Sequence, residues 1–436
     1  MSPNIRSQAG ALSPVLDWVD GRFGPILRVQ GFRPALPEPD WWTFTCDAVR
    51  PVGRHFSATS NNSQGTSLDE SEALKRALGE AIERYVCANS FDPDHTHSLT
   101  AAQSPVVAQL ARCALDEDCS ESYKTISPQA QLTHSLMSSL SNQTSVPVPS
   151  GYVHLSFVPP DKEPKITTPN SSGCAFHTEL PKAILGGLCE LAERDAAMGF
   201  WWNRKIAARL VLNQCILPFA LTDRISRIEH SGIRVKLFDI STDFPMPIIL
   251  CVLSGPHYPY QSFGTACDTD LGTSCIKAID QAIAVRFKQI KNTTKAKILS
   301  REHFDWVHDL EDQAELYASW KNCPALEFFM ESDSEIFYSQ MEERTWWQPG
   351  GELDDLSTLS RQLESNGLTV LWSDITTDDA RQFGHCVRVV VPQLIPLSVQ
   401  HSIRWLGAQR LYSGMYSKET GVPSAKHFNP FPHPFA

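Results

Sequence analysis

The chain lacks several features that define common classes of protein. Its 12 cysteines include no CxxC pair and its 14 histidines show no metal-ligand spacing, so neither a disulfide framework nor a zinc site is indicated. No apolar run approaches the roughly 20 residues that span a bilayer. The N-terminus lacks the charged-then-apolar layout of a signal peptide. We therefore expect a cytoplasmic protein without membrane segments.

The usual nucleotide-binding motifs are missing too. There is no Walker GxxxxGK[ST], no kinase-like glycine loop and no Rossmann GxGxxG. A net charge of −11 argues against a nucleic-acid binder, which normally carries a basic stripe. The surplus of carboxylates instead suits a protein that gathers them around metal ions. With 436 residues and 42% hydrophobic content, the chain can form about two or three globular units.

Apolar, β-branched runs alternate with amphipathic stretches, which predicts an α/β (α+β) fold. We expect strands within residues 41–48, 143–160, 234–241, 245–255, 368–376 and 385–396. We expect helices at residues 68–89, 98–142, 178–204, from about 273, and near 401–416. Residues 15–29 suggest a strand, a turn and a strand. Residues 1–14 suggest a disordered lead-in, and 295–350 an insertion or mobile flank.

The predicted helix at residues 178–204 carries Glu190, Glu193 and Arg194 on the side opposite its apolar face. Thr178 can cap this helix by accepting a first-turn N–H. Two carboxylates and a guanidinium could grip a divalent cation together with its phosphates. They could equally form a solvated, salt-bridged face.

The same pattern occurs earlier in the chain, in ALKRALGEAIER at residues 73–84. Aligned with AILGGLCELAER at residues 183–194, it pairs Glu80 with Glu190 and Glu83 with Glu193. Such a duplication predicts two facing acidic helices with four carboxylates around one cavity. The repulsion among them would raise some of their pKa values in the absence of metal.

Magnesium prefers oxygen ligands and is commonly shared between carboxylates and nucleotide phosphates. Arg84, Arg194 and Arg286 could bind those phosphates bidentately. Asp195 falls on the apolar side of its helix, where a buried carboxylate needs a partner. A tie to a backbone N–H or an arginine is favoured over direct catalysis.

Several motifs together resemble the YcaO superfamily. They are the paired ExxER helices, SSGCA at residues 171–175, FGTACD at 263–268 and the terminal NPFPHPFA. More narrowly, they are similar to its azoline-forming cyclodehydratases from ribosomal-peptide natural-product clusters. The resemblance implies a YcaO-like fold with a duplicated helix/strand unit around a central ATP/Mg²⁺ site. It divides the chain into a flexible N-terminus at 1–14, a YcaO-like domain at 15–425 and a Pro-rich tail at 426–436 that reaches the active site.

Such enzymes use ATP and Mg²⁺ to convert Cys, Ser or Thr of a precursor peptide to thiazoline or oxazoline rings. The implied metal ligands are Glu80, Glu83, Glu190 and Glu193. The implied cofactor-binding residues are Arg84, Ser171, Ser172, Thr178, Arg194 and Arg286. The implied residues of the catalytic tail are Pro432, Pro434 and Ala436.

The sequence departs from the family pattern at five positions on the nucleotide side. They are Gln64 in place of Lys, Arg76 in place of Ser, Thr178 in place of Asn, Lys182 in place of Glu, and Ala284 in place of Gln. Thioamide or amidine formation, or a non-catalytic scaffold, therefore remain alternatives. Implied partners are the precursor peptide and a leader-peptide-binding (E1-like/ThiF-like) protein. A flavin-dependent dehydrogenase and a homodimer are also left open.

Overall fold

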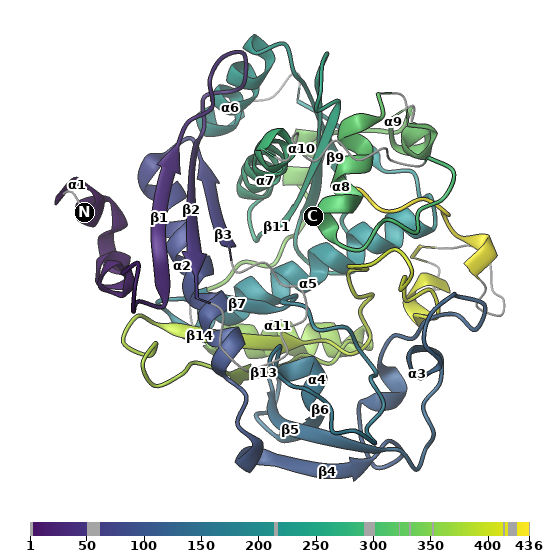
Figure 1. Cartoon of the computed structure of the whole chain (residues 1–436). Coiled ribbons are helices and arrows are strands. Elements are labelled where there is room, and N and C mark those ends of the chain that lie inside the picture. The colour runs from purple at the N-terminus through teal and green to yellow at the C-terminus, as the bar shows by residue number, and fades with distance from the viewer. Residues whose placement is uncertain are drawn as a thin grey trace.

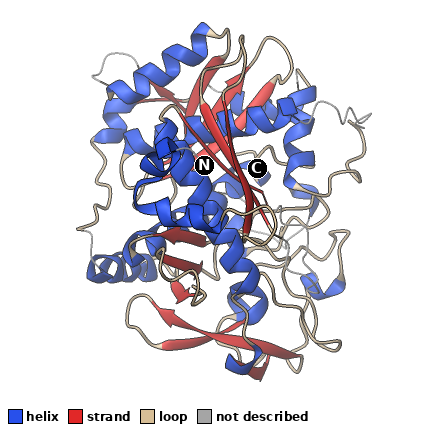
Figure 2. Cartoon of the chain, turned by 60° about the vertical axis from the view of Figure 1, so that its left-hand side comes forward, coloured by secondary structure: helices blue, strands red, loops and turns tan. Residues whose placement is uncertain are grey.

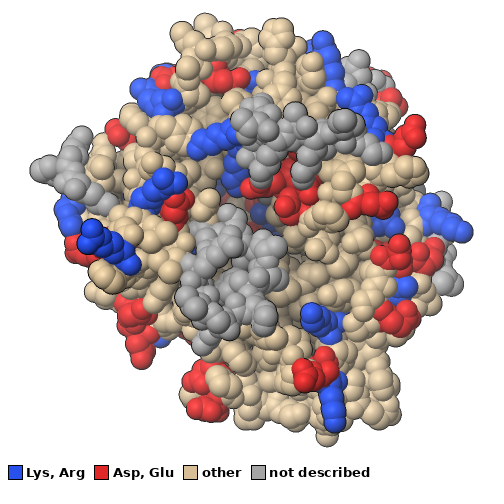
Figure 3. Space-filling model, viewed as in Figure 1, with Lys and Arg blue, Asp and Glu red and all other residues tan. Residues whose placement is uncertain are grey.

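The computed structural model describes residues 3–49, 62–212, 217–291, 301–321, 323–330, 333–350, 353–412, 415–416 and 425–435. These residues form three β-sheets with helices between and around them (Figures 1 and 2). Acidic and basic side chains are interspersed on the face shown in Figure 3. Within the described ranges, no helix combines the length and the apolar character needed to cross a membrane.

The first sheet is antiparallel, in the order β1 (Ile26–Phe32), β2 (Trp42–Ala48), β3 (Asn62–Ser67). Helix α2 (Glu70–Asn89) packs on it through buried side chains that recur at helical spacing. Asp69 caps α2 by accepting the Glu72 N–H.

The N-terminal predictions are partly wrong for the residues that the structure describes. Residues 3–18 form α1 (Pro3–Ala9) and the 3₁₀ helix η1 (Gly10–Trp18) in place of a disordered lead-in and a first strand, because α2 offers them an apolar surface. Ala9, Leu12 and Leu16 are buried in a cluster with residues of α2. The second strand predicted within 15–29 is confirmed, since β1 begins at Ile26 after a turn.

The second sheet has the order β11 (Gln261–Cys267), β10 (Ile248–Ser254), β9 (Arg234–Asp239), β8 (Ala208–Val211), β12 (Glu335–Phe337). Its strands pair antiparallel except β12, which runs parallel to β8. The strands predicted within 234–241 and 245–255 are confirmed as β9 and β10, which pair with each other. Helix α7 (Leu271–Lys291) packs on β10 and β11, and α6 (Phe219–His230) contacts α7 and β9.

The third sheet has the order β4 (Thr96–Thr100), β5 (Gln131–Ser139), β13 (Leu371–Asp374), β14 (His385–Val390), β7 (Cys174–His177). Strand β6 (Ser145–Pro149) pairs with β5 and is followed by α4 (Ser150–Val153). The helix predicted at 98–142 is wrong. This stretch holds β4, β5, the short α3 (Glu121–Lys124) and the 3₁₀ helix η3 (Val107–Gln109), because β5 is stabilised by its sheet neighbours.

Helix α5 (Leu180–Trp202) lies at the centre of the molecule (Figure 1). It contacts β7 and β14 of the third sheet and β10 and β11 of the second. Ile184, Leu188, Trp201 and Trp202 are fully buried in the largest core cluster. The helix that carries the second acidic motif is therefore fixed by two sheets.

The stretch at 295–350, predicted to be an insertion or a mobile flank, forms short helices in its described part. They are α8 (Leu310–Ser319), η5 (Pro324–Leu326), α9 (Glu327–Met330) and α10 (Tyr338–Glu342), and α11 (Leu353–Ser365) follows them. Leu316 and Tyr317 are fully buried. A mobile flank is therefore the wrong interpretation. The helix expected near 401–416 is only the 3₁₀ turn η6 (Gln409–Tyr412). The remaining 3₁₀ turns are η2 (Pro93–His95) and η7 (Ala425–His427).

Candidate functional site

The two acidic helices meet across β7, which contacts both α2 and α5. Glu83 of α2 lies close enough to Glu190 of α5 for the charge of Glu190 to raise its pKa. The structure thus brings the two predicted acidic motifs together. Within the described ranges, however, no three His, Cys, Asp or Glu side chains form a ready-made metal site.

The duplication is visible in a repeated contact between a strand backbone and a helix side chain. The Gln64 N–H donates to Glu80 Oε2 at 2.8 Å, and the Gly173 N–H donates to Glu190 Oε2 at 3.0 Å. A third unit, β11 followed by α7, repeats the contact. There the Thr265 N–H donates to Gln281 Oε1 at 3.2 Å. Alignment of the two ExxER segments identified only the first two units. The third unit has Gln281 at the position that Glu80 and Glu190 occupy in the other two, so its sequence lacks the acidic pattern.

Two arginines accompany the carboxylates. Arg84 pairs with Glu80 at 3.0 Å and donates to Ser171 Oγ at 2.6 Å. Arg194 lies 3.6 Å from Glu190 and 3.5 Å from Glu193. In the described part of the chain, Arg84 Nε, Arg194 Nε and Arg194 Nη1 are buried without a hydrogen-bond partner.

Unpaired guanidinium N–H groups are costly in a protein interior. An anion placed beside them would satisfy these donors, and phosphate oxygens match the geometry of a guanidinium. The residues present therefore fit a nucleotide phosphate. Glu190 and Glu193 are the carboxylates available to share a divalent cation with it.

Burial raises the pKa of two of the four glutamates. The pKa of Glu193 rises to about 7, mainly because burial penalises its charge, with the charge of Glu190 adding to the effect. The Thr265 hydroxyl donates to Glu193 Oε1 at 2.6 Å and opposes the rise. Burial also raises the pKa of Glu83 well above its usual value. The expected rise is thus present, but desolvation outweighs the mutual repulsion from which it was predicted.

A cavity of about 440 Å³ opens beside α5. Its α5 wall is formed by Lys182, Leu185, Gly186, Cys189, Glu190 and Glu193. The rest of its lining comprises His177, Thr265, Ala266, Cys267, Asp268, Thr269, Lys277 and Gln281. The volume is in the range of small-molecule sites. Glu80 and Glu83 do not line this cavity, so two of the four predicted carboxylates face it, and the four-carboxylate metal site stays a prediction.

The sequence analysis missed Lys277 and Gln281, which extend the cavity wall along α7. Lys277 pairs with Asp268 at 2.5 Å, directly after β11. Lys277 and Gln281 follow the FGTACD motif and are four residues apart, so they lie on the same face of α7. This spacing could have identified both as site residues from the sequence.

The other predicted nucleotide contacts lie outside this cavity. Arg286 is buried and donates to both Glu38 oxygens, at 2.6 and 2.8 Å, and to the Pro259 carbonyl at 2.7 Å. Its predicted role as a phosphate ligand is therefore replaced by a structural ion pair. Thr178 is exposed and does not cap α5, whose N-cap is Glu179. Ser172 donates its backbone N–H to the Asn170 side chain in the loop before β7.

Two of the substituted residues, Gln64 and Arg76, contact α7, and a third, Ala284, lies on α7. The Gln64 amide lies 3.4 Å from the Ala284 carbonyl, so these two positions contact each other. Arg76 pairs with the buried Asp280 at 3.0 Å, and Arg224 pairs with the same carboxylate at 3.1 Å. The region between α2 and α7 is thus held in part by the side chains of Gln64 and Arg76, two of the substituted positions.

The C-terminal tail contacts the last turn of α5, and the chain end marked C in Figure 1 lies beside β11 and α8. The Asn429 N–H donates to the Trp202 carbonyl at 2.9 Å, and Trp201 Nε1 donates to the Phe431 carbonyl at 3.1 Å. The Phe435 ring then lies 6.4 Å from that of Phe263 on β11.

Of the three tail residues predicted at the catalytic centre, the structure describes Pro432 and Pro434. Pro432 and Pro434 are buried, and Tyr317 donates its hydroxyl to the Pro432 carbonyl. Neither proline lines the cavity beside Glu190. Ala436 lies outside the described residues. The tail therefore reaches the helix that carries the acidic motif, without entering the cavity itself.

Asp195 is fully buried and satisfied, as the sequence analysis favoured. It accepts the Ile395 N–H at 3.0 Å, Arg410 Nε at 2.9 Å to each oxygen, and the Tyr416 hydroxyl at 2.6 Å. These partners lie about 200 residues or more away in the sequence. The structural interpretation of Asp195 is confirmed.

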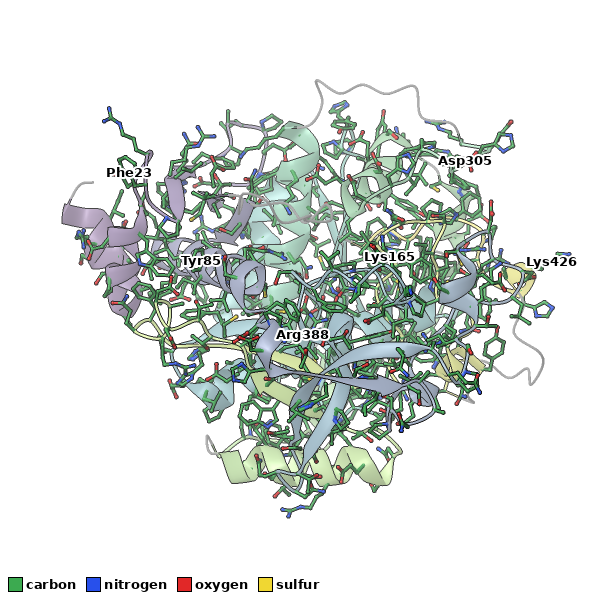
Figure 4. All side chains as sticks on the ribbon, turned by 60° about the horizontal axis from the view of Figure 1, so that its bottom comes forward. Phe23, Tyr85, Lys165, Asp305, Arg388 and Lys426 are labelled. Carbon is green, nitrogen blue, oxygen red and sulfur yellow. The ribbon has the colours of Figure 1, made fainter. Side chains whose placement is uncertain are left out.

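The 11 cysteines in the described part of the chain are free thiols. Cys174, Cys267 and Cys275 are buried, in agreement with a packing role. Arg388, labelled in Figure 4, donates Nη1 to Cys174 Sγ at 3.2 Å and links β14 to β7. Cys189 differs, because it is partly exposed and lines the cavity.

The chain belongs to the YcaO family. The family model described as YcaO cyclodehydratase, ATP- and Mg²⁺-binding, matches residues 64–395. ATP and Mg²⁺ are the cofactors that this membership assigns.

An uncharacterized protein of Methanothermobacter thermautotrophicus is 25% identical over 369 residues, which covers 81% of this chain and 86% of that protein. Among solved structures, a heterocyclase in complex with substrate and cofactor superposes with a TM-score of 0.75 at 16% identity. That match covers 98% of this chain, but the chain spans only 57% of the heterocyclase. The YcaO protein of Methanopyrus kandleri, bound with AMPPCP and Mg²⁺, superposes with a TM-score of 0.59 at 15% identity and 90% coverage of each chain. These likenesses confirm the predicted fold.

Proposed function

We propose that this protein is an ATP-dependent cyclodehydratase acting on Cys, Ser or Thr of a ribosomally made precursor peptide. It would form thiazoline or oxazoline rings by phosphorylation of the backbone amide oxygen. The observation that carries the proposal is the buried Pro-rich tail, packed against the last turn of the helix that bears Glu190 and Glu193. Such a tail is the feature by which the sequence resembles azoline formers in particular.

The reaction balances with ATP as co-substrate. The side-chain thiol or hydroxyl loses its proton to solvent as its sulfur or oxygen bonds to the preceding carbonyl carbon. The former carbonyl oxygen receives the γ-phosphoryl group, which releases ADP. Loss of that oxygen as phosphate, together with the amide proton, leaves a C=N bond and the ring. Glu190 and Glu193 would hold Mg²⁺, while Arg84 and Arg194 would offset the phosphate charge, so catalysis depends on positioning and charge neutralisation.

The precursor peptide is the proposed substrate, and a separate E1-like/ThiF-like protein is proposed to bind its leader. A flavin-dependent dehydrogenase would act afterwards, since oxidation of an azoline to an azole is a different reaction.

The test combines the protein, the proteins encoded beside it, a candidate precursor and Mg-ATP, followed by mass spectrometry. Loss of one water per modified residue is expected, and replacement of oxygen by sulfur would instead indicate thioamidation. Glu190→Gln should abolish ATP turnover while the protein stays folded. Glu364→Gln, which removes a carboxylate from an exposed site beside Ser141, is the matched control and should retain turnover. Near-wild-type turnover by Glu190→Gln would refute the metal assignment.

A non-catalytic scaffold is the second candidate. It is favoured by the contact between Gln64 and Ala284 at positions where the family resemblance predicts nucleotide ligands. If the scaffold interpretation is right, the protein will neither turn over ATP nor change the mass of the precursor. It will nevertheless be required for modification by a partner enzyme.

A further inference from the structure

Two cysteines lie next to each other in the wall of the cavity. Cys189 of α5 and Cys267, the last residue of β11, both line the cavity, and their thiols are in hydrogen-bonding contact. Both are free thiols, Cys189 being partly exposed and Cys267 buried. The proposed ring formation assigns no step to either thiol, so the pair is available for chemistry of its own.

The contact between the two thiols follows from the way in which α5 packs against β11. The Thr265 hydroxyl donates to Glu193 Oε1 at 2.6 Å, which fixes one point of this packing. From that point, Cys267 lies two residues further along the strand, on the same face and about 6.6 Å away. Cys189 lies about one turn back along the helix, on the same side and about 6 Å away. Because the two steps match in length, the fold itself brings the two sulfurs together.

Accessibility distinguishes this pair from the other neighbouring thiols in the described part of the chain. Cys87, Cys174 and Cys386 also contact one another, but all three are buried. Cys119 is partly exposed and contacts Cys113, but neither lines the cavity. The reactivity of a thiol depends on its access to the reagent. The pair in the cavity wall therefore combines an accessible thiol with a position beside the candidate site.

We propose that Cys189 and Cys267 form a thiol modification site, where a low-molecular-weight disulfide (RSSR) converts the pair to a disulfide and thereby weakens the binding of Mg-ATP in the cavity. Cys189, the accessible thiol, attacks RSSR, forms a mixed disulfide and releases one RSH. The Cys267 sulfur then attacks the Cys189 sulfur and releases the second RSH. Two protein thiols are oxidised, one disulfide is reduced, and both thiol protons end on RSH.

The new bond changes the wall of the cavity. A disulfide holds its sulfurs about 2.05 Å apart, closer than two unbonded sulfurs can lie, so α5 and β11 are drawn together and locked at this point. Glu190 follows Cys189 directly, Asp268 follows Cys267, and both carboxylates line the same cavity. Oxidation therefore displaces side chains that face the ligand. The inference rests on the part of the proposed function that places Mg-ATP in this cavity, and it is independent of which ring or thioamide is formed.

The test compares the full chain after incubation with dithiothreitol or with oxidised glutathione. Isothermal titration calorimetry measures the Kd of Mg-ATP, and a non-reducing peptide map by mass spectrometry identifies the linked cysteines. We expect a mass loss of two hydrogen atoms and a peptide that joins Cys189 to Cys267. The Kd should rise roughly 10-fold or more, which corresponds to the loss of about one charge-assisted hydrogen bond to the ligand. Dithiothreitol should reverse both changes.

Three variants assign the effect to this pair. Cys189→Ser and Cys267→Ala each remove one sulfur, so the Kd of each variant should be the same with and without oxidised glutathione. Cys119→Ser is the matched control, because it removes a partly exposed thiol that contacts another thiol away from the cavity. It should keep the full response of the wild type.

The inference would be overturned by a reaction that stops at a glutathione adduct on Cys189, or by a Cys189–Cys267 disulfide that leaves the Kd unchanged. An equal response of Cys189→Ser and the wild type would also overturn it. If the reduced wild type does not bind Mg-ATP, the nucleotide assignment of the cavity is refuted, and the inference with it. If the reduced protein binds Mg-ATP but forms no ring, only the proposed ring chemistry is refuted.

Discussion

The carboxylate of Asp195 offers the sharpest test of how the centre of this molecule is stabilised. Asp195→Asn removes the negative charge that Arg410 contacts through Nε and replaces one acceptor oxygen with a donor. Asp195 is fully buried, and Arg410 is only about one-tenth exposed. Removing one partner of a buried ion pair costs about 3–5 kcal/mol, because the remaining charge is left poorly compensated.

A second ion pair limits the expected loss of stability. Arg410 also pairs with Asp243, so its guanidinium keeps one carboxylate partner in the Asp195→Asn variant. Tyr416 would lose its acceptor or exchange it for the amide oxygen, which adds about 1 kcal/mol. We therefore expect a total near the lower end, about 3–4 kcal/mol.

Urea unfolding followed by tryptophan fluorescence would measure this change, because Trp201 and Trp202 lie on the same helix as Asp195. Asp17→Asn, which breaks the exposed pair with Arg6, is the matched control and should leave the unfolding midpoint unchanged. A double-mutant cycle with Arg410→Met should give a coupling of about 0.5–3 kcal/mol.

A loss of less than about 1 kcal/mol in Asp195→Asn would refute the ion-pair account. ATP turnover per folded molecule should persist at temperatures where the variant is native. Unchanged stability with abolished turnover would instead make Asp195 a catalytic residue.

Two further predictions follow from the described geometry. Gly264→Ala should destabilise the protein by about 1–3 kcal/mol in urea unfolding, because the new Cβ would lie 2.2 Å from the Ala278 carbonyl oxygen of α7. Gly21→Ala, where the nearest atom is 3.9 Å away, is the tolerated control, and equal midpoints would contradict the packing argument. The contribution of His154 and His401 to stability should also fall as the pH drops below about 6.5, because burial lowers the pKa of His154 to about 4 and that of His401 to about 3. In this range the unfolded state binds protons that the native state rejects, so each histidine contributes up to about 1.4 kcal/mol per pH unit. His154→Asn should reduce this slope in urea titrations at several pH values, and an unchanged slope would refute the assignment.

Several elements could be predicted because their signal is local. The helical spacing of apolar residues marks α2 and α5, and β-branched runs mark β9, β10 and β14. By contrast, the Ser-rich stretch at 98–142 has no decisive period. Its strands exist because neighbouring strands of the sheet pair with them.

The sequence by itself determined the duplicated acidic helices, the burial of Asp195 and the family. All three follow from residue types at fixed spacing on one element. Only the tertiary structure decided the partners of those residues. Arg286 could have faced a phosphate, but it pairs with Glu38, which lies 248 positions away. Gln281 is held at the cavity because its side chain accepts the Thr265 N–H of β11. His433 is held by hydrogen bonds with Ser398 and Phe435. A hydrogen bond depends on distance and direction in space, which the spacing along the chain does not specify for residues on different elements.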